Sequence, residues 1–185
     1  MKKNLPIFLT LLTSLYLFSC KQSHESVSDK YFRFLNNRQA DSLQLLLTSD
    51  FKVTLTYTTY FYNRDDFFNT YLKIKRENNE RTKIIKTIRD KEPKQFLVED
   101  SSDYLKYLDV KSTTWIVTVK SKDDKISEVI MDTTERSRNF FNDVKEKANQ
   151  FNAWLRNKYS YQYPGNLYDT AGLLLRRLRE YKEDN

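Results

Sequence analysis

The spacing of hydrophobic residues changes along the chain from a helical period to a strand period. Residues 29–36 and 41–48 place apolar side chains three or four positions apart, which predicts two short helices with one buried face each. From position 51 to 58 apolar and polar residues alternate, and this predicts a half-buried strand. The apolar members are Tyr31, Phe32, Phe34, Leu35, Leu43, Leu46 and Leu47 in the helices and Phe51, Val53, Leu55 and Tyr57 in the strand.

A third helix is predicted after Asn63, because asparagine is a favourable N-cap residue. Asp65 and Asp66 follow in the first helical turn, where the helix dipole stabilises negative charge. We therefore interpret these two acids as helix-terminal residues and not as a catalytic pair. The buried face of this helix would contain Phe67 or Phe68 together with Tyr71 and Leu72, with Ile74 as a further candidate.

Four more strands are predicted between positions 81 and 134. The first is rich in β-forming residues but alternates imperfectly, which indicates a bulge. Asp123 and Asp124 lie between the last two strands and predict a tight hairpin turn. The stretch 100–108 predicts a loop with one helical turn around Tyr104. The four strand ranges are 81–90, 94–100, 112–121 and 126–134.

The helical period returns at Arg136 and continues to the sequence YSYQYPGN, where proline and glycine end the helix. A final helix is predicted after this break. The apolar stripe of the first helix comprises Phe140, Phe141, Val144, Ala148, Phe151 and Leu155 with Trp154 beside it, and that of the second comprises Ala171, Leu174, Leu175, Leu178 and Tyr181.

The first 20 residues have the pattern of a bacterial export signal. Lys2 and Lys3 precede an apolar run at 5–18, which is short and polar for a membrane-spanning helix. The run ends in Leu17-Phe18-Ser19-Cys20, which resembles a lipoprotein processing site. The resemblance implies cleavage before Cys20 and acylation of its thiol and amine, so that Cys20 anchors the protein in a bilayer. The alternatives are an ordinary secretory peptide with an incidental cysteine and a spanning anchor.

Composition excludes several classes of site. The chain has one cysteine and one histidine, His24, which lies in the polar linker after Cys20, so no Cys-His or Ser-His-Asp nucleophile can be assembled. Soft metal sites lack ligands for the same reason. Glu99, Asp100 and Asp103 do not have the ligand spacing of a calcium loop. We therefore expect neither a metal nor a cofactor.

Charge and glycine content exclude two classes of partner. The formal net charge is +7, but acidic and basic residues alternate through most of the chain, which favours a mixed charged surface over a nucleic-acid groove. The two glycines, Gly165 and Gly172, cannot form a phosphate-binding loop or a dinucleotide fingerprint. We expect no nucleic-acid partner.

The order helix, helix, strand, helix and then a run of strands resembles the SnoaL-like or nuclear transport factor 2-like (NTF2-like) superfamily. The segments LLLTSDFKVTLTY, NRDDFFNTYL and WIVTVKSKDDKISEVIMDTT carry the resemblance, which spans about residues 27–134. It implies an α+β fold in which a curved antiparallel sheet packs on N-terminal helices to form a cone with an internal pocket. The same fold serves isomerases, dehydratases, carriers and assembly subunits, so it does not imply one function.

These observations give four segments. We expect a lipoprotein signal peptide at 1–19, a lipidated linker at 20–28, an NTF2-like domain at 29–134 and a helical extension of two helices at 135–185. The protein would lie in the bacterial cell envelope, anchored by lipid. Lys21 after the cysteine favours the outer membrane, by analogy with enterobacterial lipoproteins.

Three acids are candidates for a catalytic base. Glu128 and Asp132 share one face of the strand 126–134 with Ile126 and Ile130, and Glu99 lies on an earlier strand. If such a carboxylate points into the cone, burial would raise its pKa and suit it to accept a proton. If the face points outward, the acids are solvated, and we favour this interpretation.

Aromatic residues give the best prediction of a pocket. Tyr57, Tyr60 and Tyr62 crowd the end of the first long strand, and Tyr71 and Trp115 lie on later elements. Tyrosine has a broad apolar face and one polar tip, which suits an amphipathic ligand. The alternative is that each ring fills the core.

The sequence therefore predicts an envelope lipoprotein whose domain is not an enzyme. It would bind a small apolar or amphipathic ligand, or act as an accessory module as a homodimer or with another envelope protein. The competing hypothesis is an isomerase or dehydratase that uses a pocket carboxylate as its general base.

Overall fold

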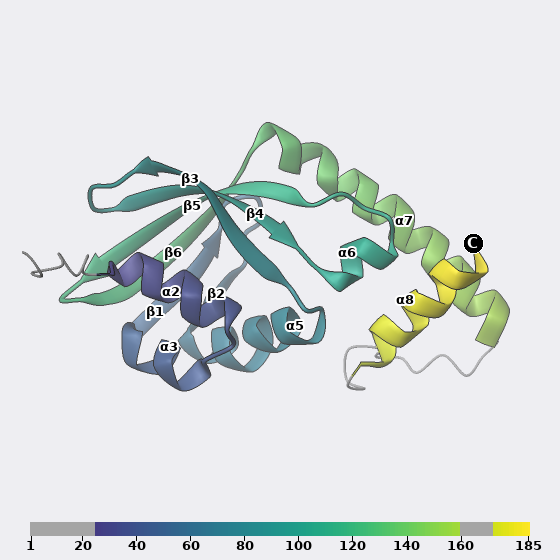
Figure 1. Ribbon diagram of the computed structural model, residues 1–185, viewed down its shortest axis with the longest axis horizontal. Helices are drawn as coiled ribbons and strands as arrows, with labels where there is room; N and C mark the ends of the chain where they lie inside the picture. The colour runs from purple at the N-terminus through teal and green to yellow at the C-terminus, as the bar shows by residue number, and fades with distance from the viewer. Residues whose placement is uncertain (1–24, 160–171) are drawn as a thin grey trace, which may run out of the picture.

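The computed structural model describes residues 25–159 and 172–185, so Cys20 and His24 lie outside the described residues. A six-stranded sheet with the order β2-β1-β6-β5-β4-β3 forms its centre (Figure 1). The strands are β1 (Leu47–Leu55), β2 (Phe61–Asn63), β3 (Arg81–Arg89), β4 (Lys94–Ser101), β5 (Thr113–Lys122) and β6 (Lys125–Thr133). The fold is α+β, as the sequence predicted.

The helices fall into two groups. The first group comprises α2 (Val27–Asn36), α3 (Ala40–Leu46), α4 (Arg64–Asp66), a π-helical turn η1 (Phe67–Tyr71) and α5 (Leu72–Glu77). The second comprises α6 (Asp103–Tyr107), α7 (Glu135–Tyr159) and α8 (Leu173–Asp184). The predicted helix after Asn63 is present, with a widened turn at 67–71, and the Asn63 side chain accepts a hydrogen bond from the backbone N–H of Asp66 at 2.9 Å.

The sheet is curved and contains one parallel pair. β1 runs parallel to β6, whereas the other neighbouring strands are antiparallel. The predicted hairpin joins β5 to β6, and both Asp123 and Asp124 adopt positive φ angles of 51° and 58°, as a tight hairpin turn requires. β3 contains the predicted irregularity, since its register with β4 shifts between Ile84 and Lys86 and again between Thr87 and Arg89. β2 is a short strand that the sequence did not predict.

The main core lies between the concave face of the sheet and the first group of helices (Figure 1). Burial alternates along β4 and β5, because successive side chains point to opposite faces of a sheet. The fully buried members, at 2% exposure or less, include Tyr31, Leu43, Leu47, Phe51, Val53, Phe67, Val98, Val119, Ile126 and Val129.

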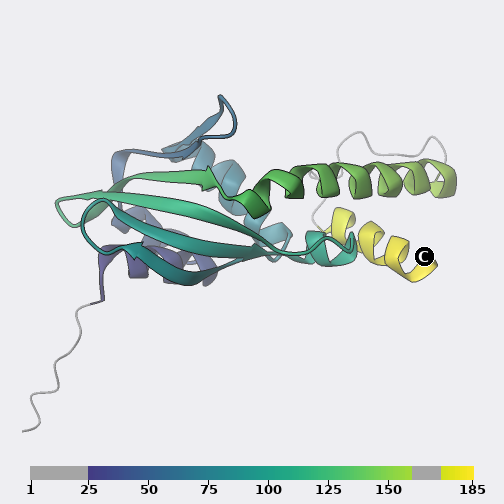
Figure 2. The same ribbon diagram turned by 90° about the horizontal axis from the view of Figure 1, so that it is seen from above.

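A second core extends the molecule beyond the sheet. α7 leaves the end of β6 and packs beside α8 (Figure 2), and α8 also contacts α6. The buried residues of this second core are Leu108, Phe151, Leu155, Leu173, Leu174 and Leu178. The start of α2 lies at the opposite end of the long axis from α8 (Figure 1).

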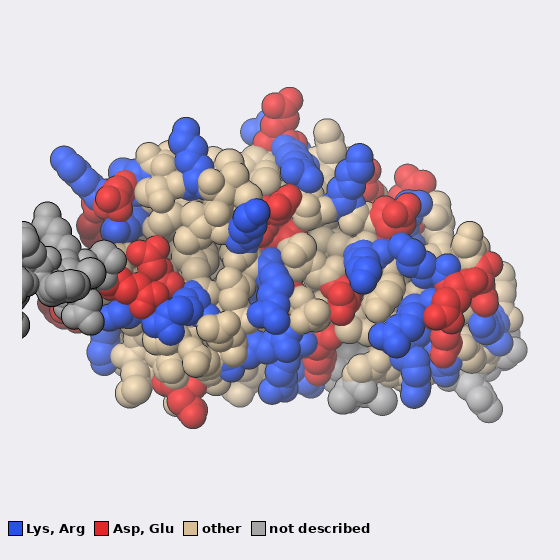
Figure 3. Space-filling model, in the orientation of Figure 1, with Lys and Arg blue, Asp and Glu red and all other residues tan. Residues whose placement is uncertain are grey.

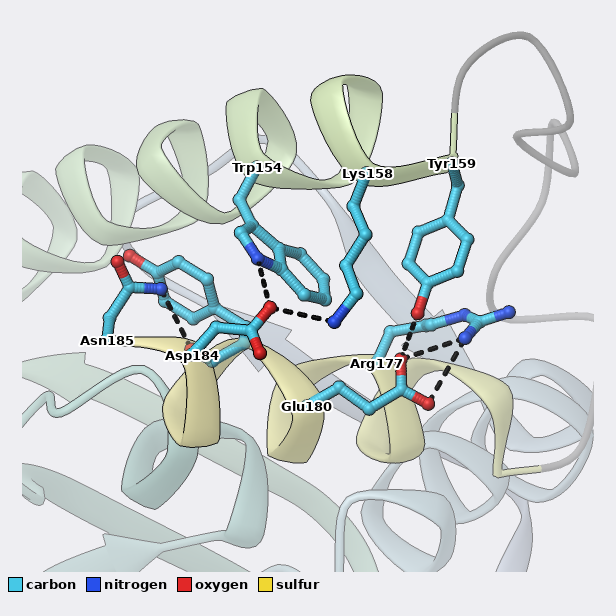
Figure 4. A network of polar contacts seen from close by, with 8 residues as sticks. Trp154, Lys158, Tyr159, Arg177, Glu180, Asp184 and Asn185 are labelled. Carbon is cyan, nitrogen blue, oxygen red and sulfur yellow. Dashed lines mark hydrogen bonds and ion pairs between the residues drawn. The ribbon is translucent and has the colours of Figure 1, made fainter.

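Polar contacts join α7 to α8 around the second core (Figure 4). Asp184 accepts hydrogen bonds from Trp154 Nε1 at 2.9 Å and Lys158 Nζ at 2.7 Å. Glu180 accepts a hydrogen bond from the Tyr159 hydroxyl and forms an ion pair with Arg177. The two helices of the extension are therefore held by apolar packing and by charged contacts at its rim.

On the face seen in Figure 3, Lys and Arg side chains are interspersed with Asp and Glu along the long axis. Surface ion pairs such as Lys94–Asp90 at 2.8 Å and Arg33–Glu25 at 2.8 Å illustrate the mixture. Among the described residues, no helix is long and apolar enough to cross a membrane.

Candidate functional site

A cavity of about 270 Å³ lies where α6 and the first turns of α7 meet the ends of β4 and β5. We call it the cone-end cavity. It combines carboxylates and hydroxyl groups with aromatic and aliphatic side chains. Its lining residues are Asn78, Glu80, Asp100, Ser101, Ser102, Tyr104, Leu105, Thr113, Trp115, Phe140, Phe141 and Val144.

Asp100 is the most buried acid of this cavity, with 8% of its surface exposed. It lies on the concave face of β4, two positions after the buried Val98, because strand side chains alternate between faces. Its register partners are Thr82 on β3 and Thr113 on β5, which are both buried. Thr82 Oγ1 donates a hydrogen bond to Asp100 Oδ1 at 2.5 Å. Thr113 Oγ1 is buried and has no hydrogen-bond partner among the described residues.

A buried ion pair adjoins Asp100. Lys75, at the inner side of α5, is 6% exposed and pairs with Glu80, which precedes β3. Lys75 Nζ also lies 3.4 Å from Thr82 Oγ1, so Thr82 connects the ion pair to Asp100. The lysine nitrogen lies 5.3 Å from the ring centroid of Tyr71, within the range of a cation–π contact.

Burial and the neighbouring charges shift the pKa of each member of this pair in opposite directions. Burial raises the pKa of the Glu80 carboxyl, and the nearby charge of Lys75 opposes this shift. Burial lowers the pKa of Lys75, but the negative charges of Glu80 and Asp100 outweigh it, so the pKa of Lys75 lies above its ordinary value. Lys75 therefore stays positively charged at neutral pH, close to the carboxyl groups of Glu80 and Asp100.

The five predicted aromatic residues form two sets of contacting rings. Tyr60 contacts Tyr62 with ring centroids 4.9 Å apart, and Tyr62 contacts Tyr71 at 5.1 Å. Tyr57 stacks on Trp115 at 5.3 Å. Of the five, only Trp115 lines the cone-end cavity, while Tyr57 covers its ring from outside.

Burial also raises the pKa values of the tyrosines in this region. It raises the pKa of Tyr57 to about 12, and it raises the pKa values of Tyr62 and Tyr71 above their ordinary value. Tyr31 on α2 is 2% exposed, and burial raises its pKa well above the ordinary value. These phenols remain protonated at neutral pH and are available as hydrogen-bond donors.

The three predicted acids lie on the convex face of the sheet, away from the cone-end cavity. Glu128 accepts hydrogen bonds from Lys120 at 2.7 Å and Thr54 at 2.9 Å, and it lies 3.3 Å from Lys52 Nζ. Burial acts to raise the pKa of Glu128, but these hydrogen bonds outweigh it and the pKa is lowered. A lowered pKa makes Glu128 a poor general base.

Asp132 and Glu99 have similar surroundings. Asp132 accepts a hydrogen bond from Thr56 Oγ1 at 2.6 Å, and Glu99 accepts one from Ser112 Oγ at 2.7 Å. Arg136 lies 3.7 Å from Glu99. Neither acid is among the residues that line the cone-end cavity.

The assignment of Ile126 to the face of Glu128 was wrong. The register of β5 with β6 shifts by one residue between Lys120–Glu128 and Ser121–Ile126. This bulge turns Ile126 toward the core, where it is fully buried with Val129, while Glu128 points outward. Strict alternation places these two residues on one face only if the strand contains no bulge.

Sequence reasoning missed Asp100, Glu80, Lys75 and Thr113 as site residues. For Asp100 the signal was present, because Phe96 and Val98 mark the inner face of β4 and the next inner position is 100. Lys75 and Glu80 lie around the polar end of a helix, where the local pattern gives no sign that they meet. Among the described residues, no group of three or more His, Cys, Asp or Glu side chains is placed to hold a metal ion.

No family model and no curated protein matches the sequence. Solved structures do match the fold. A protein from Kribbella flavida DSM 17836 superposes with a TM-score of 0.51 and 11% identity, covering 69% of this chain and 99% of that one. IdmH from Streptomyces antibioticus, a proposed polyketide cyclase, gives a TM-score of 0.50 and 8% identity, covering 64% of this chain and 96% of that one. An NTF2-like protein of unknown function from Cytophaga hutchinsonii ATCC 33406 gives a TM-score of 0.46 and 8% identity, covering 63% of this chain and 97% of that one.

The fold is NTF2-like. The helices on the concave face, the curved sheet and the pocket at its open end agree with the resemblance found in the sequence. The low identities establish the fold alone, so the NTF2-like domain of this chain must be assigned a function from its own residues.

Proposed function

We propose that this protein is a lipid-anchored envelope protein whose NTF2-like domain binds a small amphipathic molecule in the cone-end cavity. The composition of that cavity is the observation that supports this proposal. Trp115, Phe140 and Phe141 supply an apolar wall, and Asp100 and Thr113 supply buried polar groups. A concave site with apolar walls and a few converging polar groups is typical of small-molecule binding.

The size of the cavity limits the ligand. A volume of about 270 Å³ is close to the lower end of the range for small-molecule pockets, which is about 300 to 1,000 Å³. The ligand would therefore be smaller than most cofactors. α6 and α7 both contribute side chains to the lining of the cavity, so the extension takes part in forming the site.

The proposed anchor leaves this site free. The described chain begins beside α2, at the opposite end of the long axis from α8, and α6 and most of α7 lie toward the α8 end (Figure 1). A lipid on Cys20 would hold the α2 end of the domain near the bilayer. The cone-end cavity would then face away from the membrane surface, toward the soluble phase.

The anchor is tested by Cys20→Ser. We expect this variant to accumulate as the uncleaved precursor, and a normally processed, membrane-bound variant would contradict the lipoprotein assignment. Occupancy is tested by native mass spectrometry of the processed protein, extracted in detergent from the envelope of its native host. A stoichiometric small molecule released on denaturation supports the binding function, and a wholly unliganded mass opposes it.

A second function is favoured by the position of Asp100. A buried carboxylate, hydrogen-bonded to Thr82 and close to protonated tyrosines, is an arrangement that suits general-base catalysis of the isomerase or dehydratase type. We propose this activity as the alternative. Once a bound molecule has been identified, Asp100→Asn separates the two: an enzyme loses turnover of that molecule or its precursor, whereas a binding protein shows no turnover in either form.

A further inference from the structure

The carboxylates of the cone-end cavity outnumber the cations that face it. Among the described residues that line the cavity, Glu80 and Asp100 are the charged ones, and both are acidic. Lys75 approaches from beneath and pairs with Glu80, which leaves one negative charge without a matching cation. An unmatched charge away from water is costly, so a cation entering this cavity gains more than it would at the surface.

A separate feature of the cavity points to a missing hydrogen-bond partner. Thr113 is 1% exposed, and its Oγ1 has no hydrogen-bond partner among the described residues. It lies directly across the β4–β5 pair from Asp100, in the lining of the same cavity. A buried hydroxyl without a partner is uncommon in folded proteins, and a ligand atom at this point would satisfy it.

The walls of the cavity are suited to an organic cation and not to a bare metal ion. Trp115, Tyr104, Phe140 and Phe141 contribute aromatic rings, which attract cations to their faces. Metal ions such as Ca²⁺ require six to eight oxygen ligands, and an aromatic wall does not supply them. A protonated primary amine has three N–H donors for carboxylate and hydroxyl oxygens.

We infer that the cone-end cavity recognises a protonated primary amine that carries an apolar body. The ammonium group binds between Asp100, Glu80 and Thr113 Oγ1, and the apolar body contacts Trp115, Phe140 and Phe141. This inference rests on the proposed small-molecule function and adds the chemical class of the ligand. It assigns Asp100 the role of counter-ion and Thr113 that of hydrogen-bond acceptor.

Three probes of matched size and different charge test the inference. They are 2-phenylethylamine, which is an ammonium ion at pH 7.5, the neutral 2-phenylethanol and the anionic 3-phenylpropanoate. Each is titrated by calorimetry into the processed, lipid-anchored protein in phosphatidylcholine nanodiscs, with empty nanodiscs as the reference. We expect the amine to bind at least tenfold more tightly than the alcohol, and the carboxylate to give no saturable binding.

Variants then locate the binding. Asp100→Asn removes the negative charge with little change in size, and we expect it to weaken amine binding about tenfold while alcohol binding stays within twofold. Thr113→Val keeps the shape and removes the hydroxyl, and we expect a loss of amine affinity of about fivefold. Glu99→Gln is the matched control, because it removes a charge from the neighbouring position of β4 on the convex face. It should bind all three probes as the parent does.

The outcomes distinguish this inference from the function on which it rests. Equal binding of amine and alcohol, unchanged in Asp100→Asn, would overturn the amine assignment and leave a cavity for apolar molecules. Absence of amine binding would also overturn it, and the native mass spectrum would then decide the binding function separately. If Asp100→Asn does not fold, Thr113→Val in the same titration retains the test, since undiminished amine binding by that variant opposes the inference.

Discussion

Tyr57 and Trp115 stack with their ring centroids 5.3 Å apart, although Tyr57 follows β1 and Trp115 lies within β5. Phe141 of α7 contacts both rings, at 5.0 Å from Tyr57 and 5.8 Å from Trp115. As a result Trp115 is 5% exposed, while Tyr57 and Phe141 are 36% and 39% exposed. The two outer rings therefore shield the indole that forms part of the cavity wall.

This relationship predicts a fluorescence change. In a Trp154→Phe background Trp115 is the single tryptophan, because the chain contains two. Tyr57→Ala should admit water to the indole, shift its emission to longer wavelength and increase quenching by acrylamide. Tyr60→Ala is the control, since Tyr60 packs on Tyr62 and not on Trp115. Emission and quenching that stay the same in Tyr57→Ala would show that Tyr57 does not shield Trp115.

The buried pair of Lys75 and Glu80 predicts a large effect on stability. Lys75→Met leaves the Glu80 carboxyl in the interior without its cation. Because breaking one side of a buried pair is strongly destabilising, we expect the free energy of unfolding to fall by about 3 kcal/mol. The measurement is urea-induced unfolding at pH 7, followed by circular dichroism.

Two further variants test whether the loss of stability comes from leaving the Glu80 charge without its cation. Lys75→Met combined with Glu80→Gln removes both charges and should recover much of the lost stability. Lys94→Met breaks the pair with Asp90, whose side chain is 81% exposed, and should cost less than about 1 kcal/mol. A loss in Lys75→Met no larger than that in Lys94→Met would mean that the pair contributes as a surface ion pair does.

The hydrophobic pattern was sufficient to place most helices and strands because most elements have one buried face, and the curved-sheet fold was predicted from the resemblance of their order to the NTF2-like superfamily. The alternation of apolar and polar residues in β4 and β5 and the apolar stripes of α2 and α7 indicate which side of each element is buried. The pattern could not predict β2, which has three residues and is mostly exposed. It also could not show that β1 runs parallel to β6, since pairing partners are set by tertiary packing.

The candidate site was predicted in part. The pocket prediction rested on Tyr57, Tyr60 and Tyr62 at the end of the first long strand with Tyr71 and Trp115 on later elements, and of these five Trp115 lines the cone-end cavity. Asp100 was not predicted, because choosing between Glu99 and Asp100 depends on one step of register, which moves a side chain to the opposite face. The contact of Lys75 with Glu80 and Thr82 joins a helix to a strand, and no local spacing encodes it.

The buried tyrosines predict loss of stability at alkaline pH. In the folded protein the pKa of Tyr57 is about 12, and those of Tyr31 and Tyr71 are raised. The unfolded chain ionises these phenols near pH 10, so their contribution to stability is complete below pH 10 and declines as the pH rises through 12. Lys75, whose pKa is also raised, acts in the same direction above pH 10.5.

Urea unfolding measured from pH 8 to pH 12 tests this dependence. The free energy of unfolding should decrease above pH 10, and Tyr71→Phe, which keeps the ring and removes the ionisable group, should reduce the decrease. Phenolate absorbance at 295 nm gives an independent measure, since a fraction of the 13 tyrosines should ionise only as the chain unfolds. Complete ionisation near pH 10 in a protein that stays folded would contradict the burial of these hydroxyl groups.

The extension predicts a coupling between the second core and the cavity. Leu178 of α8 is fully buried among Leu108, Phe151 and Leu155, and truncating a buried leucine to alanine costs about 2 to 5 kcal/mol. α6 contributes Tyr104 and Leu105 to the cavity lining, and Tyr104 also packs against the second core. Leu178→Ala should therefore loosen α6 as well as α8.

Hydrogen exchange measures this coupling segment by segment. We expect Leu178→Ala to speed amide exchange in α6, α8 and the second half of α7, while β1 and β6, which belong to the main core, keep the exchange rates of the parent. Lys158→Ala is the matched control at the rim of the same helix pair (Figure 4), because Lys158 and Asp184 are both about 40% exposed and such a pair contributes less than about 1 kcal/mol. Faster exchange confined to α8, with α6 unchanged, would show that the extension stabilises itself without supporting the cavity. Faster exchange that reaches α6 would mean that the C-terminal helix stabilises the part of the cavity wall that α6 supplies, although α8 does not line the cavity itself.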